Sequence, residues 1–551
     1  MKRCAKTPDL RFSRAKLLVR ISLCLIFALQ ILSAISFSQT PNLEWVRTYG
    51  PSDSLADFLN DMDIDTNGNV YVTGRIAVNS QNTNYATVKY NSAGVQQWVA
   101  TYNGIGTNSI DEAVALRVDK AGNVFVTGYS EARGFLSDTY VTIKYNTNGV
   151  MQWLARYDGG VRDDPKAIFV DDSGYVYISG ISYKSGQGSD YLTIKYDKNG
   201  DSVWVKRYNG PMNQNDNARD MTVDGMGNVY VTGDSQDDYL TIKYSPQGQL
   251  LWAQRYTIGL DISWKVVTDN NGNVFVTGTV SINNNDDILT IKYLPDGSLA
   301  WYNRYNGTAN SLDNAKDMKL DPSQNIYVTG VSSTNSTGTD YITIKYNQNG
   351  DTNWVRYFTN GSTMDNDIAY SIDVDGIGVY VTGRAYDINS SFQITTVKYD
   401  LNGNLIWVTE FNNNNSTGNK IGKKVKVFNG IVVVAGDGPM TTNRNFITIK
   451  YNQLVGINNA HNSVPNVIKL SNYPNPFNPV SIINYYIPQN DIYTLNIYDV
   501  TGKEVEILFK EMKQRGGYSL NYNAMDLSAG IYFMKLSSSK YIITHKIVVL
   551  K

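Results

Sequence analysis

Cysteine and histidine are almost missing from this sequence of 551 residues. Its two cysteines, Cys4 and Cys24, stand near the N-terminus, and its two histidines, His461 and His545, stand near the C-terminus. A Ser-His-Asp triad, a Cys-His pair or a histidine metal centre therefore cannot be assembled within residues 39–452. Disulfides are excluded there as well, so the stability of this long segment must come from a hydrophobic core.

The N-terminus has the pattern of a secretory signal. Seven basic residues lie in the first 20, and an apolar run from Ile21 to Phe37 follows them. Small residues end the run, so we expect a signal peptide at residues 1–38 that is cleaved near Ser38 and leaves no transmembrane segment. An uncleaved anchor helix is the alternative, because the run is just long enough to span a bilayer.

A block of basic residues is missing from the rest of the chain. Removal of residues 1–38 takes away seven basic residues and one acidic residue, which leaves 42 against 49 and a net charge of about −7. We expect neither nucleic acid nor an anionic membrane as a partner of a chain with this charge pattern.

The sequence does contain a repeat with a period of roughly 50 residues, and each copy has four strand signals separated by Gly and Asn turns. In the second copy the strands are expected at 113–118, 124–127, 140–145 and 151–157, with Gly128 stopping the second. Four antiparallel strands make one blade of a β-propeller. The recurring glycines are Gly74, Gly128, Gly180, Gly233, Gly278, Gly330, Gly383 and a weaker Gly436. The recurring tryptophans are Trp45, Trp98, Trp153, Trp204, Trp252, Trp301, Trp354 and Trp407.

The two ends of the repeat region predict how the array closes. The mature chain opens on a lone fourth strand at 43–49, and the repeats end on a third strand at 446–451. We expect residues 43–49 to complete the sheet formed by 421–451, which would close a ring and remove its free edges. The predicted fold is all-β with eight blades. Seven blades are the alternative, because the eighth copy is degraded at 422–430.

The repeats resemble a known family. The motifs Asp-x-x-Gly-Asn-Val-Tyr-Val-Thr-Gly and Tyr-x-Thr-Ile-Lys-Tyr-Asn make residues 43–451 similar to the bacterial SBBP-type β-propeller repeats. This resemblance implies a fold and no particular activity, since propellers serve many functions. We therefore predict a propeller at 39–452, a linker at 453–470 and a separate C-terminal domain at 471–551.

The C-terminal domain shows a second resemblance. Its alternating apolar strands and Gly turns predict a small immunoglobulin-like β-sandwich. The segments 473–479, 492–502, 527–533 and 544–551, in this order, resemble the type A sorting domain of the type IX secretion system. An ordinary immunoglobulin-like accessory domain is the alternative. The residues that match the sorting motif are Gly502, Asp526, Leu527, Gly530, Ile531, Tyr532, Lys546 and Lys551.

This second resemblance implies a route for the protein. The chain would be recognised by the type IX translocon, and a sortase would cleave the tail and attach the protein to the cell surface. We therefore expect a protein that is secreted or attached to the outer surface of a Gram-negative bacterium.

Three groups of residues are candidates for chemistry. The repeated tryptophans are expected to pack between blades, whereas the extra Trp264 could be core or a ring for stacking a sugar. Asp119 and Asp269 begin hairpin turns and are weak calcium candidates, because a second carboxylate and a bidentate Glu are missing; turn capping is the favoured role. A second set of aspartates recurs eight residues before the aspartates that begin the hairpin turns. We expect this second set to form ion pairs with the repeated lysines of the third strands; a charged ring that lines the channel is the alternative. The aspartates of this second set are Asp57, Asp111, Asp163, Asp216, Asp261, Asp313 and Asp367.

The sequence predicts a non-enzymatic binding, adhesion or scaffold module without a cofactor. Its ligand would be a carbohydrate or a protein held by variable loops such as 130–138, 182–190 and 331–340. A polysaccharide hydrolase or lyase with carboxylates at the channel mouth is the alternative. A purely structural spacer is the third possibility. No pair of carboxylates in the sequence departs from the repeat pattern as a catalytic pair would.

Overall fold

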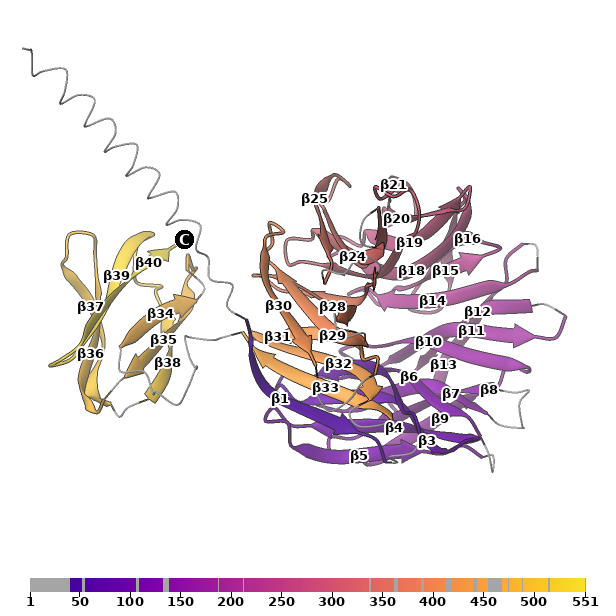
Figure 1. Ribbon diagram of the computed structural model, residues 1–551, viewed down its shortest axis with the longest axis horizontal. Helices are drawn as coiled ribbons and strands as arrows, with labels where there is room; N and C mark the ends of the chain where they lie inside the picture. Colours follow the sequence, from indigo (N-terminus) through magenta and orange to yellow (C-terminus); the bar gives the residue numbers. More distant parts are fainter. Residues whose placement is uncertain are drawn as a thin grey trace, which may run out of the picture. The chain divides into compact units, whose positions relative to one another are not determined.

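The structure is a computed structural model that divides the chain into two compact units, residues 1–454 and 455–551. Each unit is described by itself (Figure 1). The described residues are 40–51, 55–105, 109–131, 138–186, 188–211, 213–335, 338–360, 365–387, 391–412, 418–439, 443–453, 468–473, 475–487, 489–513 and 516–550. The predicted signal peptide and most of the predicted linker lie outside these residues. Within them, no helix is present that could cross a membrane.

The first unit contains eight sheets, numbered here in chain order. Sheet 1 contains β2 (Phe58–Ile64), β3 (Val70–Asn79), β4 (Asn82–Tyr90) and β5 (Gln96–Tyr102). Sheet 2 contains β6 (Asp111–Val118), β7 (Val124–Glu131), β8 (Asp138–Tyr145) and β9 (Met151–Tyr157). Sheet 3 contains β10 (Arg162–Val170), β11 (Val176–Lys184), β12 (Gly188–Tyr196) and β13 (Ser202–Tyr208). Sheet 4 contains β14 (Asp216–Val223), β15 (Val229–Ser235), β16 (Asp238–Tyr244) and β17 (Leu250–Tyr256).

The second half of the unit repeats this plan. Sheet 5 contains β18 (Leu260–Thr268), β19 (Val274–Ile282), β20 (Asn285–Tyr293) and β21 (Leu299–Tyr305). Sheet 6 contains β22 (Asp313–Leu320), β23 (Ile326–Thr334), β24 (Gly338–Tyr346), β25 (Thr352–Phe358) and the short β26 (Asp365–Asn366). Sheet 7 contains β27 (Ile368–Val374), β28 (Val379–Asp387), β29 (Ser391–Tyr399) and β30 (Leu405–Phe411). Sheet 8 contains β31 (Ile421–Phe428), β32 (Ile431–Pro439), β33 (Arg444–Asn452) and β1 (Asn42–Tyr49).

The N-terminal strand closes the circle of sheets, as the sequence predicted. Strand β1 pairs antiparallel with β33, with Tyr49 opposite Phe446 and Leu43 opposite Tyr451. The first strand of each sheet contacts the first strands of the two neighbouring sheets, and β2 contacts β31, so the contacts run through a full circle. This arrangement is that of a β-propeller, and the predicted all-β fold is confirmed.

The hydrophobic core of this unit lies between neighbouring sheets. The middle strands are buried along almost their whole length, as in β15, whereas the fourth strands are mostly exposed or half-buried. One cluster joins Tyr177 and Tyr191 of sheet 3 to Met221 and Val231 of sheet 4. Because each sheet buries both faces in this way, a ring of sheets stabilises itself without disulfides.

The repeated tryptophans connect each sheet to the next. The indole Nε1 of Trp98 donates to the carbonyl oxygen of Thr147 in sheet 2 at 3.0 Å. Its ring packs on Gly149, where a Cβ would lie 2.7 Å from the ring, and the φ of +78° also favours glycine there. The same hydrogen bond to the next sheet is made by Trp45, Trp153, Trp204, Trp252, Trp301 and Trp354.

The glycine expected to end the second strand does not end it. Strand β7 runs through Gly128 to Glu131. Opposite Gly128, strand β6 carries a bulge, because Ala113 pairs with Gly128 and Ala115 with Thr127 while Val114 stays between them. A Cβ on Gly128 would lie 2.0 Å from the carbonyl oxygen of Glu112. The glycine is needed because the bulged backbone approaches it closely.

The expected ion pair between the repeated aspartates and lysines is wrong. In sheet 4, Asp216 accepts from the backbone N of Gly210 at 2.5 Å, and the Nζ of Lys243 donates to the carbonyl oxygen of Pro295 at 2.9 Å. Asp216 pairs with Ser235 and Lys243 with Tyr230 along β15. These positions are roughly 17 Å apart at about 3.3 Å per residue. The two charges therefore lie at opposite ends of the sheet.

The second unit consists of two sheets around one core. Residues from both sheets, among them Ile483 and Tyr485 on one and Leu495 and Met534 on the other, form a single hydrophobic cluster. This is the layered arrangement of a β-sandwich. One sheet contains β34 (Lys469–Tyr473), β35 (Val480–Ile487) and β38 (Gly516–Asn523). The other contains β36 (Asp491–Tyr498), β37 (Glu504–Lys513), β39 (Gly530–Ser537) and β40 (Ile542–Val549).

Candidate functional site

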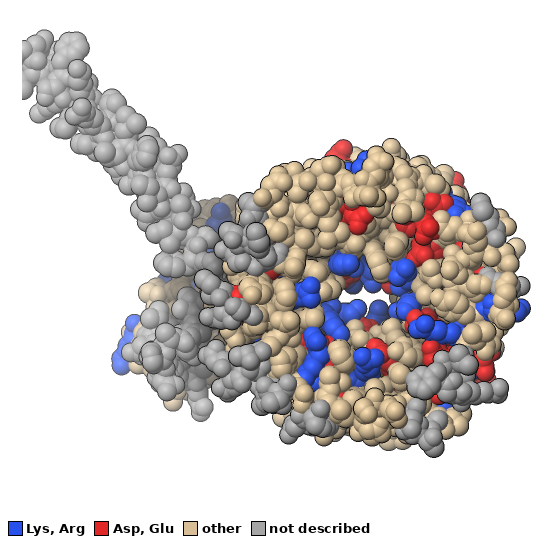
Figure 2. Space-filling view, turned by 45° about the vertical axis from the view of Figure 1, so that its right-hand side comes forward, with Lys and Arg blue, Asp and Glu red and all other residues tan. Residues whose placement is uncertain are grey.

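The first strands of the eight sheets surround a central channel, whose opening is rimmed mainly by Lys and Arg side chains (Figure 2). Each first strand is an edge strand of its sheet and carries the bulge described for β6. We call the eight bulged residues the bulge ring. They are Asn60, Val114, Lys166, Arg219, Trp264, Lys316, Tyr370 and Lys423. All charges in this ring are positive, and its two large aromatic side chains break the repeat.

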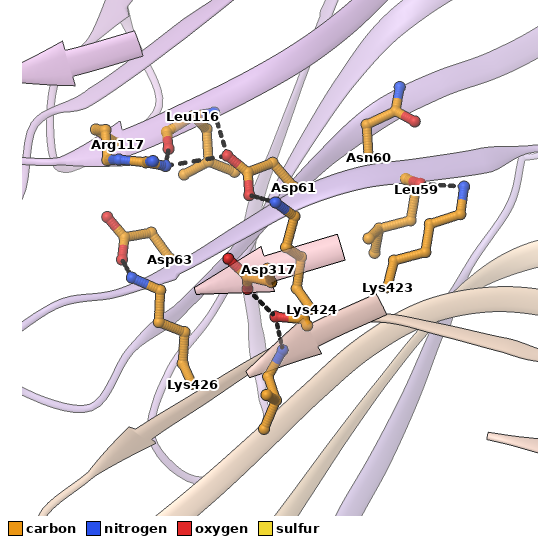
Figure 3. A network of polar contacts seen from close by, with 12 residues as sticks. Leu59, Asn60, Asp61, Asp63, Leu116, Arg117, Asp317, Lys423, Lys424 and Lys426 are labelled. Atoms are coloured by element: carbon orange, nitrogen blue, oxygen red, sulfur yellow. Dashed lines mark hydrogen bonds and ion pairs between the residues drawn. The ribbon is translucent and has the colours of Figure 1, made fainter. Parts of the chain in front are cut away.

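Below the bulge ring, carboxylates connect neighbouring first strands. Asp61 accepts from the backbone N of Leu116 at 3.0 Å and contacts Arg117 at 3.1 Å and Lys424 at 3.2 Å (Figure 3). Burial would raise the pKa of Asp61, but the charges of Lys424 and Arg117 and the backbone N–H donors outweigh it and lower the pKa. Asp61 is therefore ionised, and both of its carboxylate oxygens contact donors.

The same connection recurs around the channel. Asp220 accepts from the backbone N of Val266 at 3.0 Å, and Asp317 accepts from the backbone N of Ile372 at 3.1 Å. In each case the carboxylate satisfies an N–H of the adjacent edge strand, which would otherwise lack a partner. The charge of Asp220 also contributes to the raised pKa of Arg117, although the two residues belong to sheets 4 and 2. The channel is therefore narrow enough for charges on non-adjacent sheets to act on one another.

Cations of the bulge ring differ in how well they are neutralised. Lys166 contacts Asp164 at 2.6 Å, Arg219 contacts Asp234 at 2.8 Å, and Lys423 contacts Asp437 at 2.7 Å. Lys316 has no carboxylate within ion-pair distance among the described residues, and burial lowers its pKa. Its Nζ lies 5.3 Å from the ring centre of Trp264, and the guanidinium of Arg219 lies 4.5 Å from the same ring.

The calcium candidates cap turns. Asp119 accepts from the backbone N of Ala121 and Asn123 and from the side-chain amide of Asn123, at 2.8–2.9 Å. Asp269 makes the equivalent contacts with Asn271 and Asn273. Over the described parts of the chain, no group of three or more His, Cys, Asp or Glu side chains is placed to hold a metal ion.

The sorting-motif residues lie in two turns and two strands of the second unit. Gly502 has a φ of +83° in the turn between β36 and β37, where its backbone N donates to the carbonyl oxygen of Asp499. Leu527 is buried in the core, and Asp526 beside it is exposed. Gly530, Ile531 and Tyr532 begin β39, and Lys546 is exposed on β40. Lys551 lies outside the described residues.

Sequence reasoning missed the bulge ring. The bulged residue lies three positions after each repeated Asp, from Asp57 onward, but the residues on both sides of it also vary, so no constant motif marks it. The variable loops that were expected to hold a ligand fall partly outside the described residues, at 132–137, 187 and 336–337. The site that the structure brings together is the channel opening.

Comparison with known proteins agrees with both parts of the chain. The β-propeller repeat model SBBP matches residues 44–80 and 203–239, and the secretion system C-terminal sorting domain model matches residues 471–550. No curated protein sequence matches the chain.

Solved structures also resemble the chain. One is PorZ, a surface component of the type IX secretion system of Porphyromonas gingivalis, with 12% identity, 88% of this chain and 68% of that chain covered, and a TM-score of 0.35. Another is Sqt1 of Chaetomium thermophilum, with 9% identity, coverage of 76% and 99%, and a TM-score of 0.48. Both TM-scores are below 0.5, so neither likeness bears on function. From the family matches, the chain is an SBBP-type β-propeller repeat protein with a type IX sorting domain, secreted or held on the outer surface of a Gram-negative bacterium.

Proposed function

We propose that the protein is an exported, non-enzymatic binding module whose ligand site is the channel opening. In this proposal each of the eight sheets is one blade of an eight-bladed propeller. The tail is an immunoglobulin-like sandwich that is read by the type IX translocon and processed by its sortase. The propeller then binds a carbohydrate or a protein outside the cell.

The observation that supports this proposal is the bulge ring. The middle strands of the eight sheets repeat similar side chains, and a repeated side chain is explained by packing. At the bulge ring the side chains differ from sheet to sheet and include four cations, a tryptophan and a tyrosine. All eight residues are half-buried, and side chains that vary from sheet to sheet beside a channel are typical of a surface that recognises a ligand.

The hydrolase or lyase alternative requires two carboxylates that are free to exchange protons. Asp61, Asp220 and Asp317 each accept a backbone N–H from the next strand, which fixes them in structural roles. Glu112 accepts from Asn60 at 2.8 Å and from Arg75 at 2.8 Å. These contacts favour binding over catalysis. The proposal includes no cofactor, and it assigns turn capping rather than calcium binding to Asp119 and Asp269.

A screen that measures binding and turnover together tests this proposal. The mature full-length protein is applied to a panel of soluble polysaccharides and to surface-protein extracts, and each polysaccharide is then assayed for new reducing ends and for unsaturated products. We expect saturable binding without product formation. Product formation would instead support the hydrolase or lyase, and the absence of any binding would support a structural spacer.

A further inference from the structure

We infer that the ligand of the channel opening is an acidic polysaccharide and that Lys316, Trp264 and Arg219 hold its anionic group. This inference rests on the proposed binding function and names the ligand class. It concerns one sector of the bulge ring, formed by strands β14, β18 and β22 of three successive sheets.

The sector contains a cation that lacks a counter-charge. Lys316 is half-buried, and its only recorded partner in the described part of the chain is the ring of Trp264. A partly buried ammonium group without an anion is unfavourable, which agrees with the lowered pKa of Lys316. An anionic ligand would supply the missing charge. The other cations of the ring already have carboxylates of their own.

The same sector contains polar atoms without partners. Among the described residues, the buried Nε1 of Trp264 has no hydrogen-bond partner, and the same is true of the Oγ1 of Thr279 and the Oδ1 of Asn314. Thr279 lies opposite Ile262 on the neighbouring strand, and Asn314 is two residues before Lys316. Buried donors and acceptors of this kind are normally satisfied, so the wall of this sector holds polar atoms that its own residues leave unpaired. A ligand carboxylate would supply the acceptor that the Nζ of Lys316 lacks.

A polar cleft continues from this sector over sheet 4. The cleft has a volume of about 450 Å³ and is lined by five residues with side-chain amides, by Gly188, and by two aspartates. They are Asn213, Gln214, Asn215, Asn217, Gln236, Asp234 and Asp237. Side-chain amides donate and accept at once, which suits the hydroxyl groups of sugars.

The cleft borders Arg219 through Asp234, and Arg219 lies against the same Trp264 ring as Lys316. Asp234 lines the cleft and also accepts from Arg219 at 2.8 Å and from Asn217 at 2.7 Å. Hydroxyl recognition in the cleft, in the same sector as the unneutralised Lys316, is the chemistry expected for a chain of acidic sugars. An acidic peptide would offer the charge without the hydroxyl groups.

Calorimetric titration of the mature full-length protein tests this inference. The probes are polygalacturonate, dextran sulfate, neutral dextran, polyglutamate and single-stranded DNA. We expect polygalacturonate to bind with an affinity that falls as salt rises, and dextran sulfate shows whether a sulfate can replace the carboxylate. Lys316→Gln should weaken binding by roughly tenfold or more, because a charge-assisted contact is lost.

Two further variants separate the loss of the Lys316 contact from a general loss of positive charge. Lys316→Arg keeps the positive charge and should retain most of the affinity. Lys120→Gln removes one positive charge from an exposed turn, where both Lys120 and its partner Asp172 are 77% exposed, and should change the affinity less than twofold. Each variant is first shown to unfold at the wild-type temperature.

Several outcomes would overturn the inference. Equal losses of affinity in Lys316→Gln and Lys120→Gln would show only a general charge effect. Binding of polyglutamate or DNA as tightly as polygalacturonate would show that the site does not recognise sugars. If dextran binds to wild type and to Lys316→Gln equally well, the ligand class is wrong but the binding module stands. If polysaccharides are cleaved, the proposed function itself fails.

Discussion

Asp57 and Asp261, at the start of two first strands, are buried and have no cation within ion-pair distance among the described residues. Asp261 is fully buried, and its Oδ2 accepts from the backbone N of Ile258 at 3.0 Å. Its other carboxylate oxygen has no partner in the described part of the chain. Burial raises the pKa of Asp261 to about 6, and the same cause raises the pKa of Asp57 to about 6. The propeller therefore contains carboxyl groups that keep their proton to a higher pH than a free Asp side chain does.

These groups predict how the stability of the propeller changes with pH. The native state holds a proton on Asp261 that the unfolded state, with a carboxyl pKa near 3.8, has already released. Protonation of Asp261 therefore adds to the free energy of unfolding. This gain is present in full below about pH 4 and is lost as the pH rises through about 6. The side chain of the variant Asp261→Asn stays uncharged at every pH. Between pH 5 and pH 7, the Tm of this variant should therefore fall by roughly 1–3 °C less than the Tm of wild type.

The control for this prediction is Asp201→Asn, because Asp201 is exposed in a turn. Thermal unfolding of the three proteins across this pH range is the measurement. If Asp261→Asn shows the same pH dependence as wild type and as Asp201→Asn, the buried carboxyl group does not titrate as described.

Strand β1 is the element on which closure of the ring depends. It provides the fourth strand of sheet 8, and Trp45 donates from its Nε1 to the carbonyl oxygen of Ser92 in sheet 1 at 3.3 Å. Without β1, strand β33 would become an exposed edge with unpaired N–H and C=O groups.

A chain that begins at Gly50 is therefore expected to be less stable and to associate with itself. Loss of the Trp45 contacts alone should lower the free energy of unfolding by about 3 kcal/mol or more. Thermal unfolding and light scattering after size-exclusion chromatography measure the two effects, with a chain that begins at Thr40 as the control. A monomer with the Tm of the control would show that β1 is dispensable.

How far the sequence predicted these elements depended on what each residue contacts. The strands, the tryptophan contacts and the pairing of β1 followed from local patterns that repeat. The role of Gly128 did not, because a bulge in the neighbouring strand is not visible in the sequence of its own strand. The pairing of the Asp and Lys charges was wrong although the strand order was right, because the first and third strands of an antiparallel sheet run in the same direction. An Asp at the start of one and a Lys near the end of the other therefore lie at opposite ends. The bulge ring could not be predicted in this way, because its members differ from sheet to sheet and no repeat marks them.

The two units of the chain have separate roles in this account. The tail directs export, and the propeller carries the ligand site. A chain truncated after Asn452 should therefore remain in the periplasm, whereas the full-length chain should reach the medium or the cell surface. Mass spectrometry of culture medium and washed cells measures both, and the exported form should lack the tail. Export of the truncated chain at the wild-type level would refute the sorting role.

The central claim of this account is that the ligand binds in the channel opening and not on the outer loops. Hydrogen–deuterium exchange of the mature protein, with and without an oligogalacturonide, tests this claim most directly. We expect slower exchange in β14, β18 and β22 and in the cleft residues 213–217, with little change elsewhere in the propeller. No change in these segments, or slower exchange confined to the loops at 182–190 and 331–340, would contradict the account.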